Sequence, residues 1–312
     1  MKKAIVAGGN GLIGRALVET LAKEKISVLV LGSAEEIHND LKKLKNSNIK
    51  YFQIKNHQYS FENIIKDIQK KIETQECVFF NLAWKGKTRL TDGKIEDQLK
   101  NVNLSCELVR IAKKIGAKKY ITTGSMEELM LKRYVEEDYW INDNDSVNPS
   151  WYALAKVSSQ MQSAFEAYNN KIDFCYARIS IVIDINLRTN KFVENSFKSL
   201  LKNPKIIVPN NNELCNISSS IEIGKQLFAI GEYGMNKRVY TLGTEECRSL
   251  VDYFNKFSKM AHPKINITKS NFDRRILLLK KKDFNVKNLK IDTGYKSKET
   301  TDILFNKLLK KR

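Results

Sequence analysis

The decisive stretch of this chain is Met1-Lys-Lys-Ala-Ile-Val-Ala-Gly-Gly-Asn-Gly-Leu-Ile-Gly-Arg-Ala16. It predicts a short buried strand over residues 4–7, a glycine-rich turn, and a helix over residues 12–23. The G-x-x-G-x-x-G spacing allows a tight turn and a close approach of the backbone to a pyrophosphate, which the helix N-terminus also attracts. We therefore predict a dinucleotide ligand, with these contacts: Gly8, Asn10, Gly11, Leu12, Ile13, Gly14 and Arg15.

The composition is that of a soluble globular protein with excess positive charge. Of 312 residues, 42% are hydrophobic and 29% are charged, and the net charge is +19. This charge fits a nucleic-acid partner, but it also fits a lysine-rich surface around an anionic small substrate. The basic residues are spread along the chain and no nucleic-acid-binding motif occurs. We therefore predict a small-molecule substrate and no nucleic acid.

The cysteines and the apolar runs bear on the compartment. The five cysteines are far apart and form no C-x-x-C pair, which indicates free thiols in a reducing compartment. No apolar run approaches membrane-spanning length, so we expect a cytoplasmic protein without stable membrane insertion. The helix expected over residues 300–311 has an apolar stripe that fits either a membrane surface or the protein core.

Strand and helix patterns alternate through the first part of the chain. Apolar runs predict strands over residues 26–31, 51–54, 77–83, 119–123 and 174–183, and amphipathic segments predict helices over residues 61–72, 98–115 and 151–168. This alternation predicts the α/β class, with a Rossmann-type doubly wound parallel sheet as an NAD(P)-binding domain over residues 1–183. The later pattern is looser. Residues 184–312 are expected to form mainly a smaller substrate-binding cap, with a strand near 239–242 returning to the core sheet.

The end of the second expected strand bears on the choice of cofactor. NAD enzymes of this architecture carry an acidic residue there, which holds the adenosine ribose hydroxyls. Here the strand ends in Leu31-Gly32-Ser33, and the nearest acids are Glu35 and Glu36. Arg15 and Ser33 could instead contact a 2′-phosphate. The sequence therefore favours NADP(H), with NAD(H) as the alternative.

A serine, a tyrosine and a lysine carry the predicted chemistry. Tyr152 and Lys156 lie four residues apart, on one face of the helix expected over residues 151–168. A nearby ammonium group stabilises a phenolate, so the tyrosine can exchange a proton near neutral pH. The Y-x-x-x-K spacing occurs three times in the chain, but only Tyr152 opens a helix after a strand-end serine, Ser125. We predict Ser125, Tyr152 and Lys156 as the catalytic residues.

Together these features resemble an extended short-chain dehydrogenase/reductase of the NAD-dependent epimerase/dehydratase family, the nucleotide-sugar-modifying enzymes. The resemblance covers essentially the whole chain and rests on these segments: Gly8-x-x-Gly11-x-x-Gly14, Asn81-Leu82-Ala83, Asn101-Val102, Thr123-Gly124-Ser125 followed by Met-Glu-Glu, Tyr152-Ala-Leu-Ala-Lys156, Arg178, and Leu289-x-x-x-x-Gly294-Tyr295.

The resemblance implies a role for each group. Tyr152 is the expected general acid/base at the sugar oxygen, Lys156 tunes it and binds the nicotinamide ribose, and Ser125 positions the oxygen. The implied cofactor contacts outside the glycine turn include Leu82, Ala83, Asn101, Tyr152 and Lys156. The predicted substrate contacts are Trp84, Met126, Glu127, Arg178 and Arg188. A homodimer through the helices expected over residues 98–115 and 151–168 is also implied.

The reaction class has three candidates. The missing acid after the second strand, with Arg15, favours an NADPH-dependent reductase of a nucleotide-linked 4-keto sugar in surface-polysaccharide biosynthesis. The alternative is a nucleotide-sugar 4-epimerase with tightly bound NAD, and the least favoured is a non-catalytic dinucleotide-binding regulator. Ser125-Met126-Glu127 lacks the central acid of the dehydratases' Thr-Asp-Glu row, which disfavours a 4,6-dehydratase. The histidines are isolated, so no metal site is expected.

Overall fold

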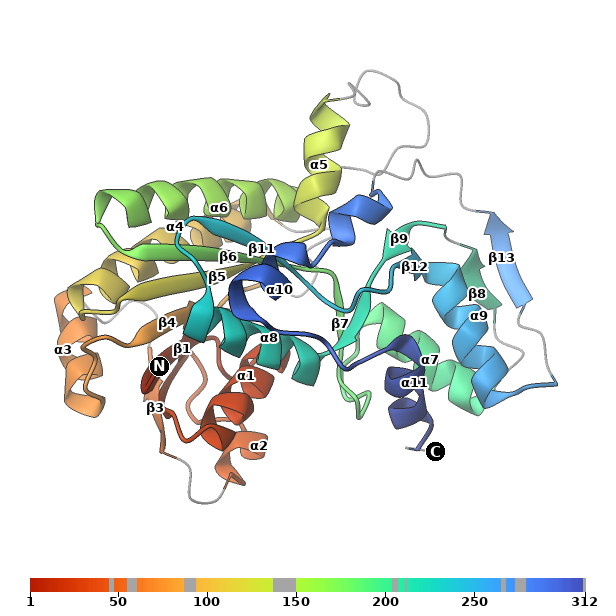
Figure 1. The fold of residues 1–312 in the computed structure, drawn as a ribbon, viewed down its shortest axis with the longest axis horizontal. Helices are drawn as coiled ribbons and strands as arrows, with labels where there is room; N and C mark the ends of the chain where they lie inside the picture. Colours follow the sequence, from red (N-terminus) through yellow and green to blue (C-terminus); the bar gives the residue numbers. More distant parts are fainter. Residues whose placement is uncertain are drawn as a thin grey trace.

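The computed structural model describes residues 1–44, 48–54, 61–86, 94–136, 150–203, 207–210, 212–264, 268–272 and 279–310. Within these ranges the central element is a seven-stranded parallel sheet of order β11-β6-β5-β4-β1-β2-β3 (Figure 1). Its strands are β1 (Lys3–Ala7), β2 (Ser27–Gly32), β3 (Ile49–Gln53), β4 (Val78–Asn81), β5 (Lys119–Ser125), β6 (Asp173–Ile179) and β11 (Arg238–Leu242). The predicted Rossmann-type α/β fold is confirmed.

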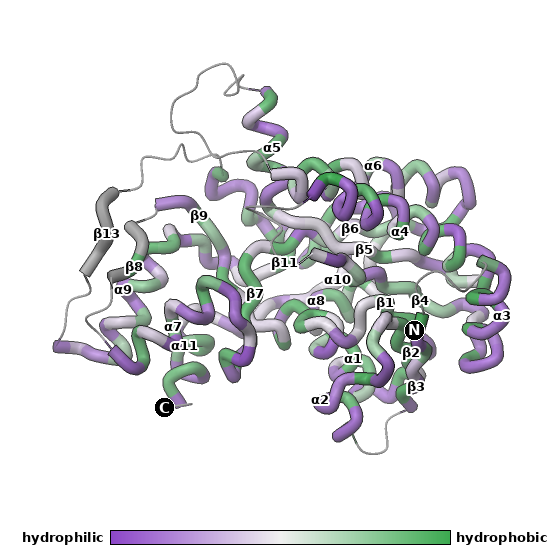
Figure 2. Tube along the Cα trace, turned by 180° about the vertical axis from the view of Figure 1, so that it is seen from behind, coloured by the Kyte–Doolittle hydropathy of each residue, from purple (hydrophilic) through white to green (hydrophobic). Residues whose placement is uncertain are grey.

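Two layers of helices cover the sheet (Figure 1). One layer holds α1 (Leu12–Lys23), α2 (Asn39–Lys42), α8 (Ser220–Tyr233) and α10 (Lys287–Thr293), and the other holds α3 (Phe61–Lys71), α4 (Ile95–Lys114) and α6 (Trp151–Asn169). Successive residues of a strand point to opposite faces, so Ala4 and Val6 pack towards the first layer and Ile5 and Ala7 towards the second. Hydrophobic and hydrophilic residues alternate along the outer helices, as one-sided burial requires (Figure 2).

The prediction of a single strand over residues 174–183 is wrong. β6 ends at Ile179, and after Ser180 the chain enters β7 (Ile181–Ile183), which pairs with β10 (Ile217–Ser219) outside the central sheet. The Ser180 hydroxyl accepts the Asn216 N–H at 3.2 Å, which fixes the point of departure. Apart from Arg178 and Ser180 the run is apolar, because both of its parts pack into apolar cores.

The C-terminal part has its own apolar core. Phe197 lies at its centre, with ring centroids 4.6 Å from Phe257, 5.3 Å from Phe305 and 5.6 Å from Phe254. The helices around it are α7 (Phe192–Lys202), α9 (Leu250–Ala261) and α11 (Thr301–Leu309). Short strands complete this part: β8 (Ile207–Asn210), β9 (Leu214–Cys215), β12 (Arg248–Ser249) and β13 (Thr268–Phe272). The apolar residues 206–208 also predict a strand over 205–208, and residues 205–206 of it lie outside the described part of the chain.

Several element boundaries differ from the sequence pattern. Helix α5 (Glu127–Glu136) and the short 3-10 helix η1 (Lys281–Phe284) lie where no element is predicted. Helix α9 begins at Leu250 because the Ser249 hydroxyl accepts the Asp252 N–H, at 3.1 Å. Gly116 follows α4 with φ +84°, the left-handed conformation that is typical of a glycine after the end of a helix.

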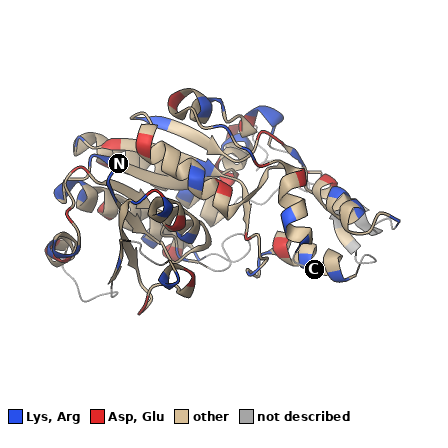
Figure 3. Cartoon of the chain, turned by 60° about the horizontal axis from the view of Figure 1, so that its bottom comes forward, with Lys and Arg blue, Asp and Glu red and all other residues tan. Residues whose placement is uncertain are grey.

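The charged residues are not gathered on one element. Lys and Arg occur on both parts of the molecule, with Asp and Glu among them (Figure 3). Where the chain is described, no helix combines the length and the hydrophobicity needed to cross a bilayer.

Candidate active site

The glycine turn packs against the end of β4. Gly8 has φ +78°, and a Cβ atom there would lie 2.7 Å from the Ala83 nitrogen and from the Leu82 carbonyl carbon. A Cβ atom at Gly14 would lie 2.3 Å from the Gly8 carbonyl oxygen. Glycine is therefore required at both positions. The turn and residues 82–83 meet at the carboxyl edge of the sheet, where α/β proteins bind their ligands.

The N-terminus of α1 is suited to a phosphate. Its N-cap is Gly11, which has no side chain to cap the first N–H groups, and its first turn contains no acidic residue. Asn10 fixes the neighbouring loop, because its Oδ1 accepts the His38 N–H at 2.9 Å and its Nδ2 donates to the Glu36 carbonyl at 3.0 Å. The turn and the segment that follows β2 therefore form one rigid border of the site.

Two predicted cation contacts share one carboxylate. Arg188 lies with Nη1 2.8 Å from Oδ2 of Asp40 and Nε 2.7 Å from Oδ2 of Asp184, and Arg15 Nε lies 3.5 Å from the same Asp40 oxygen. Arg15 Nη1 also donates to the Asn10 carbonyl at 2.9 Å. Burial alone would raise the pKa of Asp40, but Arg188, His38 and Arg15 hold it below its ordinary value. Arg188 therefore lies on the side of the site next to α2.

The predicted catalytic helix residues are buried beside Trp84. Ser150 begins α6, since its hydroxyl accepts the Ala153 N–H at 3.1 Å. Tyr152 and Lys156 are each only 5% exposed. Lys156 Nζ donates to the Thr123 carbonyl at 3.0 Å and lies 3.6 Å from the centroid of the Trp84 ring. The Trp84 and Tyr152 rings are nearly perpendicular, with centroids 5.9 Å apart.

A short segment connects the glycine turn to this pair. Residues 82–83 touch Gly8, and the next residue, Trp84, touches both Tyr152 and Lys156. Asn101 holds the end of the segment, because its side-chain amide accepts the Lys85 N–H at 2.8 Å and donates to the Lys85 carbonyl at 2.9 Å. The sequence predicts that Asn101 contacts the cofactor. In the structure, its side chain instead hydrogen-bonds the backbone of Lys85.

Ser125 ends β5, two residues after Thr123 and hence on the same face of the strand. Its hydroxyl oxygen accepts the Glu127 N–H at 3.3 Å. Met126 is 3% exposed and packs with Leu279 and Phe284 in a small apolar cluster. The edge of the sheet therefore brings Ser125 and Glu127 together, while Met126 points into the protein.

Arg178 of β6 lies opposite Gly124 of β5 and contacts Glu128, a residue that the sequence analysis missed. Its Nε lies 3.1 Å from Oε2 of Glu128, and its Nη2 donates to Gln160 Oε1 at 3.4 Å. Glu128 is fully buried and also accepts the Ser125 N–H. The only sequence signal was the Met-Glu-Glu run after Ser125, in which Glu127 was the predicted contact.

Comparison with known proteins decides the family. A sequence profile of the NAD dependent epimerase/dehydratase family matches residues 4–211. The chain belongs to this family. The resemblance drawn from the motifs is thereby confirmed, and the chain is an enzyme of the short-chain dehydrogenase/reductase type.

Similar proteins extend the comparison. The uncharacterized protein YtbQ of Bacillus subtilis (strain 168) is 25% identical over 224 residues, which cover 66% of this chain and 78% of YtbQ. UDP-N-acetylglucosamine 4-epimerase from Bacillus cereus has a TM-score of 0.75 at 12% identity, over 99% of this chain and 96% of that one. Bordetella bronchiseptica WbmH in complex with NAD+ has a TM-score of 0.69 at 14% identity, over 99% and 96%. At these identities the structural matches show the shared fold.

The residues present fit the dinucleotide that the family name implies. The uncapped N-terminus of α1 can hold a pyrophosphate, and the segment over residues 82–84 leads from this turn to Tyr152 and Lys156. A dinucleotide along this edge would have its phosphates at Gly11–Gly14 and its nicotinamide end near Lys156.

Proposed function

We propose that this enzyme interconverts the C4 epimers of a nucleotide-linked hexose with NAD as its cofactor. The observation that carries the proposal is the contact of Tyr152 and Lys156 with the segment that borders the glycine turn. Epimerisation, as opposed to net reduction, is supported by a protein of similar fold: the B. cereus protein is a UDP-N-acetylglucosamine 4-epimerase.

The proposed roles follow from the chemistry of each side chain. The Tyr152 phenolate oxygen takes the proton of the sugar 4-hydroxyl and later returns it. The Lys156 ammonium favours the phenolate form during this exchange, and the Ser125 hydroxyl hydrogen-bonds the sugar oxygen and holds it in line. Bound NAD would supply the acceptor and then the donor of the carbon-4 hydride, which must return to the opposite face of the ketone for the configuration to invert. Tyr152 and Lys156 are each only 5% exposed, so few water molecules can reach these two side chains.

The test is conversion of candidate substrates by the purified protein. The protein is incubated with UDP-glucose, with UDP-N-acetylglucosamine and with the C4 epimer of each. The sugar signals are followed by NMR. Approach to the same equilibrium mixture from either epimer, without net change in dinucleotide, is the expected result. Conversion of none of these sugars by a protein that binds NAD would contradict the proposal.

The second candidate is an NADPH-dependent reductase of a 4-keto nucleotide sugar in surface-polysaccharide biosynthesis. The observation that favours it is the end of β2, where Gly32 and Ser33 provide no carboxylate for the adenosine ribose. This reaction would consume NADPH in proportion to product. Either reaction fits the cytoplasm, where we propose that the enzyme works.

We propose NAD rather than NADP because Asp40 engages the cations that a 2′-phosphate would need. Replacing Asp40 by Asn is expected to release Arg15 and Arg188 and to lower the ratio of the dissociation constants for NADP and NAD about tenfold. Titration of both dinucleotides by calorimetry measures this ratio. The control Glu19→Gln removes the same charge from the exposed side of α1, where Glu19 pairs with Lys23. A ratio that is equal in Asp40→Asn and wild type would contradict the assignment.

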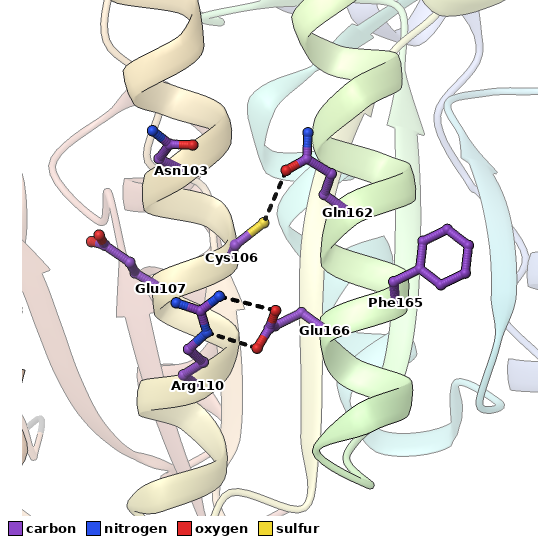
Figure 4. Close-up of a pocket in the computed structure, with 7 residues that line it drawn as sticks. All are labelled: Asn103, Cys106, Glu107, Arg110, Gln162, Phe165 and Glu166. Carbon is purple, nitrogen blue, oxygen red and sulfur yellow. Dashed lines mark hydrogen bonds and ion pairs between the residues drawn. The ribbon is translucent and has the colours of Figure 1, made fainter.

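We also propose that α4 and α6 form a homodimer interface. A hollow of about 350 Å³ lies between them, with Arg110 Nε and Glu166 Oε1 2.7 Å apart across it, and Phe165 of α6 is one of its lining residues (Figure 4). Large apolar side chains of α6 are exposed here, including Phe165 (66%) and Met161 (56%).

Replacing Phe165 by Glu is expected to convert the dimer to a monomer, because it would bury two unpaired charges in a symmetric interface. Light scattering at micromolar concentration measures the molar mass. The control Ile291→Glu places the same charge on α10, at a residue that is 65% exposed. A wild-type protein that is already monomeric would remove the proposal.

A further inference from the structure

Glu128 is a carboxylate buried at the first turn of α5, directly behind Ser125. Its side chain has 0% exposure. Oε1 accepts the Ser125 N–H and the Tyr176 hydroxyl, each at 2.6 Å, and Oε2 accepts Arg178 Nε at 3.1 Å. Three donors from β5 and β6 therefore converge on one carboxylate.

The sequence around Ser125 makes room for this arrangement. A Cβ atom at Gly124 would lie 2.3 Å from Oε1 of Glu128 and 2.4 Å from the Tyr176 hydroxyl. Any larger residue would push the carboxylate and the phenol away from the strand. Gly124 thus allows Glu128 to reach the backbone of the residue whose hydroxyl is expected to meet the substrate.

The same cluster also contacts the helix that carries Tyr152 and Lys156. The Tyr176 hydroxyl lies 3.4 Å from the Lys156 carbonyl oxygen, and Arg178 Nη2 donates to Gln160 on α6 at 3.4 Å. Glu128 therefore stands between the strand end at Ser125 and the helix α6. A shift of the carboxylate would move these two elements relative to one another.

We propose that Glu128 is a positioning residue that fixes Ser125 relative to Tyr152 and Lys156. This inference rests on the proposed function, in which Ser125 and Tyr152 meet the same sugar oxygen and Lys156 supports the Tyr152 phenolate. Glu128 does not touch substrate or cofactor. It acts by holding the Ser125 backbone with one oxygen and Arg178 with the other.

Two substitutions test this role. Glu128→Gln keeps the shape but has a single acceptor oxygen, so it cannot satisfy both Ser125 and Arg178. We expect kcat for epimerisation to fall about 10²-fold, as for a misplaced reactive group, while the dissociation constant for NAD stays within about twofold. Tyr176→Phe removes one hydrogen bond and keeps the ion pair, so kcat should fall about fivefold. The control Glu136→Gln removes a charge from the exposed end of α5 and should leave kcat unchanged.

The double variant distinguishes positioning from a loss of stability. If Tyr176 acts through Glu128, the variant Glu128→Gln/Tyr176→Phe has the kcat of Glu128→Gln within about threefold. Wild-type kcat in a folded Glu128→Gln protein would overturn the inference. If Glu128→Gln does not fold, Tyr176→Phe is the test. A lower kcat with unchanged KM and melting temperature supports the inference. An unchanged kcat overturns it.

A substrate-independent readout separates this inference from the proposed function. If the wild-type protein binds NAD but converts no sugar, the proposed function fails. The positioning role of Glu128 is then tested by amide hydrogen exchange of the NAD-bound protein. Tyr176→Phe should then accelerate exchange at Ser125 about tenfold and leave Ile5 in β1 unchanged. Equal protection of Ser125 in both proteins would overturn the positioning role.

Discussion

Tyr152→Phe is expected to bind NAD as the wild type does and to lose about 10³-fold in turnover. The substitution removes only the hydroxyl group. The phenyl ring keeps its buried place and its perpendicular contact with Trp84, 5.9 Å between centroids, so neither the fold nor the dinucleotide site should change. The measurement pairs kcat for epimerisation with calorimetric titration of NAD.

Tyr233 provides the matched control for this substitution. It is the first residue of another Y-x-x-x-K spacing, Tyr233 with Lys237, but it ends α8 and is 62% exposed. Tyr233→Phe should therefore keep full activity. A Tyr152→Phe protein with more than about a tenth of wild-type turnover would refute the assignment of Tyr152 as the proton-transfer group.

Gly14→Ala is expected to abolish measurable dinucleotide binding. The added methyl group would lie 2.3 Å from the Gly8 carbonyl oxygen and 2.7 Å from Gly9 Cα. Both are backbone atoms, which cannot rotate away as a side chain does. Helix α1 must therefore shift from the turn, at a cost of about 1–3 kcal/mol in the free energy of unfolding. The measurements are NAD titration and chemical denaturation.

Gly294→Ala separates lost stability from lost binding. Gly294 has φ +67°, and a Cβ atom there meets nothing within 4 Å, so the substitution costs about 1 kcal/mol of backbone strain without a clash. This variant should bind NAD normally. If Gly14→Ala binds NAD as tightly as Gly294→Ala does, the glycine turn is not the pyrophosphate site.

Local patterns were sufficient to predict the sheet and the core of the site. The alternation of strands and helices gave the Rossmann-type fold, because buried parallel strands are short apolar runs between amphipathic helices. The pairing of Tyr152 with Lys156 follows from helical geometry, and the fold indicates where these side chains lie relative to the glycine turn. Both inferences depend on residues that are close together in sequence.

Long-range contacts account for what the sequence did not reveal. The apolar run over residues 174–183 does not show that the chain leaves the sheet at Ser180, because the pairing of β7 with β10 depends on residues far along the chain. Similarly, no residue next to Glu128 in sequence indicates that its carboxylate is buried and hydrogen-bonded. Its importance is visible only when Tyr176 and Arg178 of β6 lie beside it.

The charge pairs near α2 illustrate the same limit. The sequence predicts a cofactor contact for Arg15 and a substrate contact for Arg188. In the fold both reach Asp40. The proposed preference for NAD therefore rests on Asp40, a carboxylate that lies beyond the end of β2.

One isotopic measurement tests the central claim most directly. UDP-glucose with deuterium at carbon 4 is converted by the purified enzyme, and the UDP-galactose product is examined by mass spectrometry and NMR. The account predicts that the product retains the deuterium at carbon 4 and that no reduced dinucleotide is consumed. Loss of deuterium to water, or oxidation of NADPH in proportion to product, would contradict it.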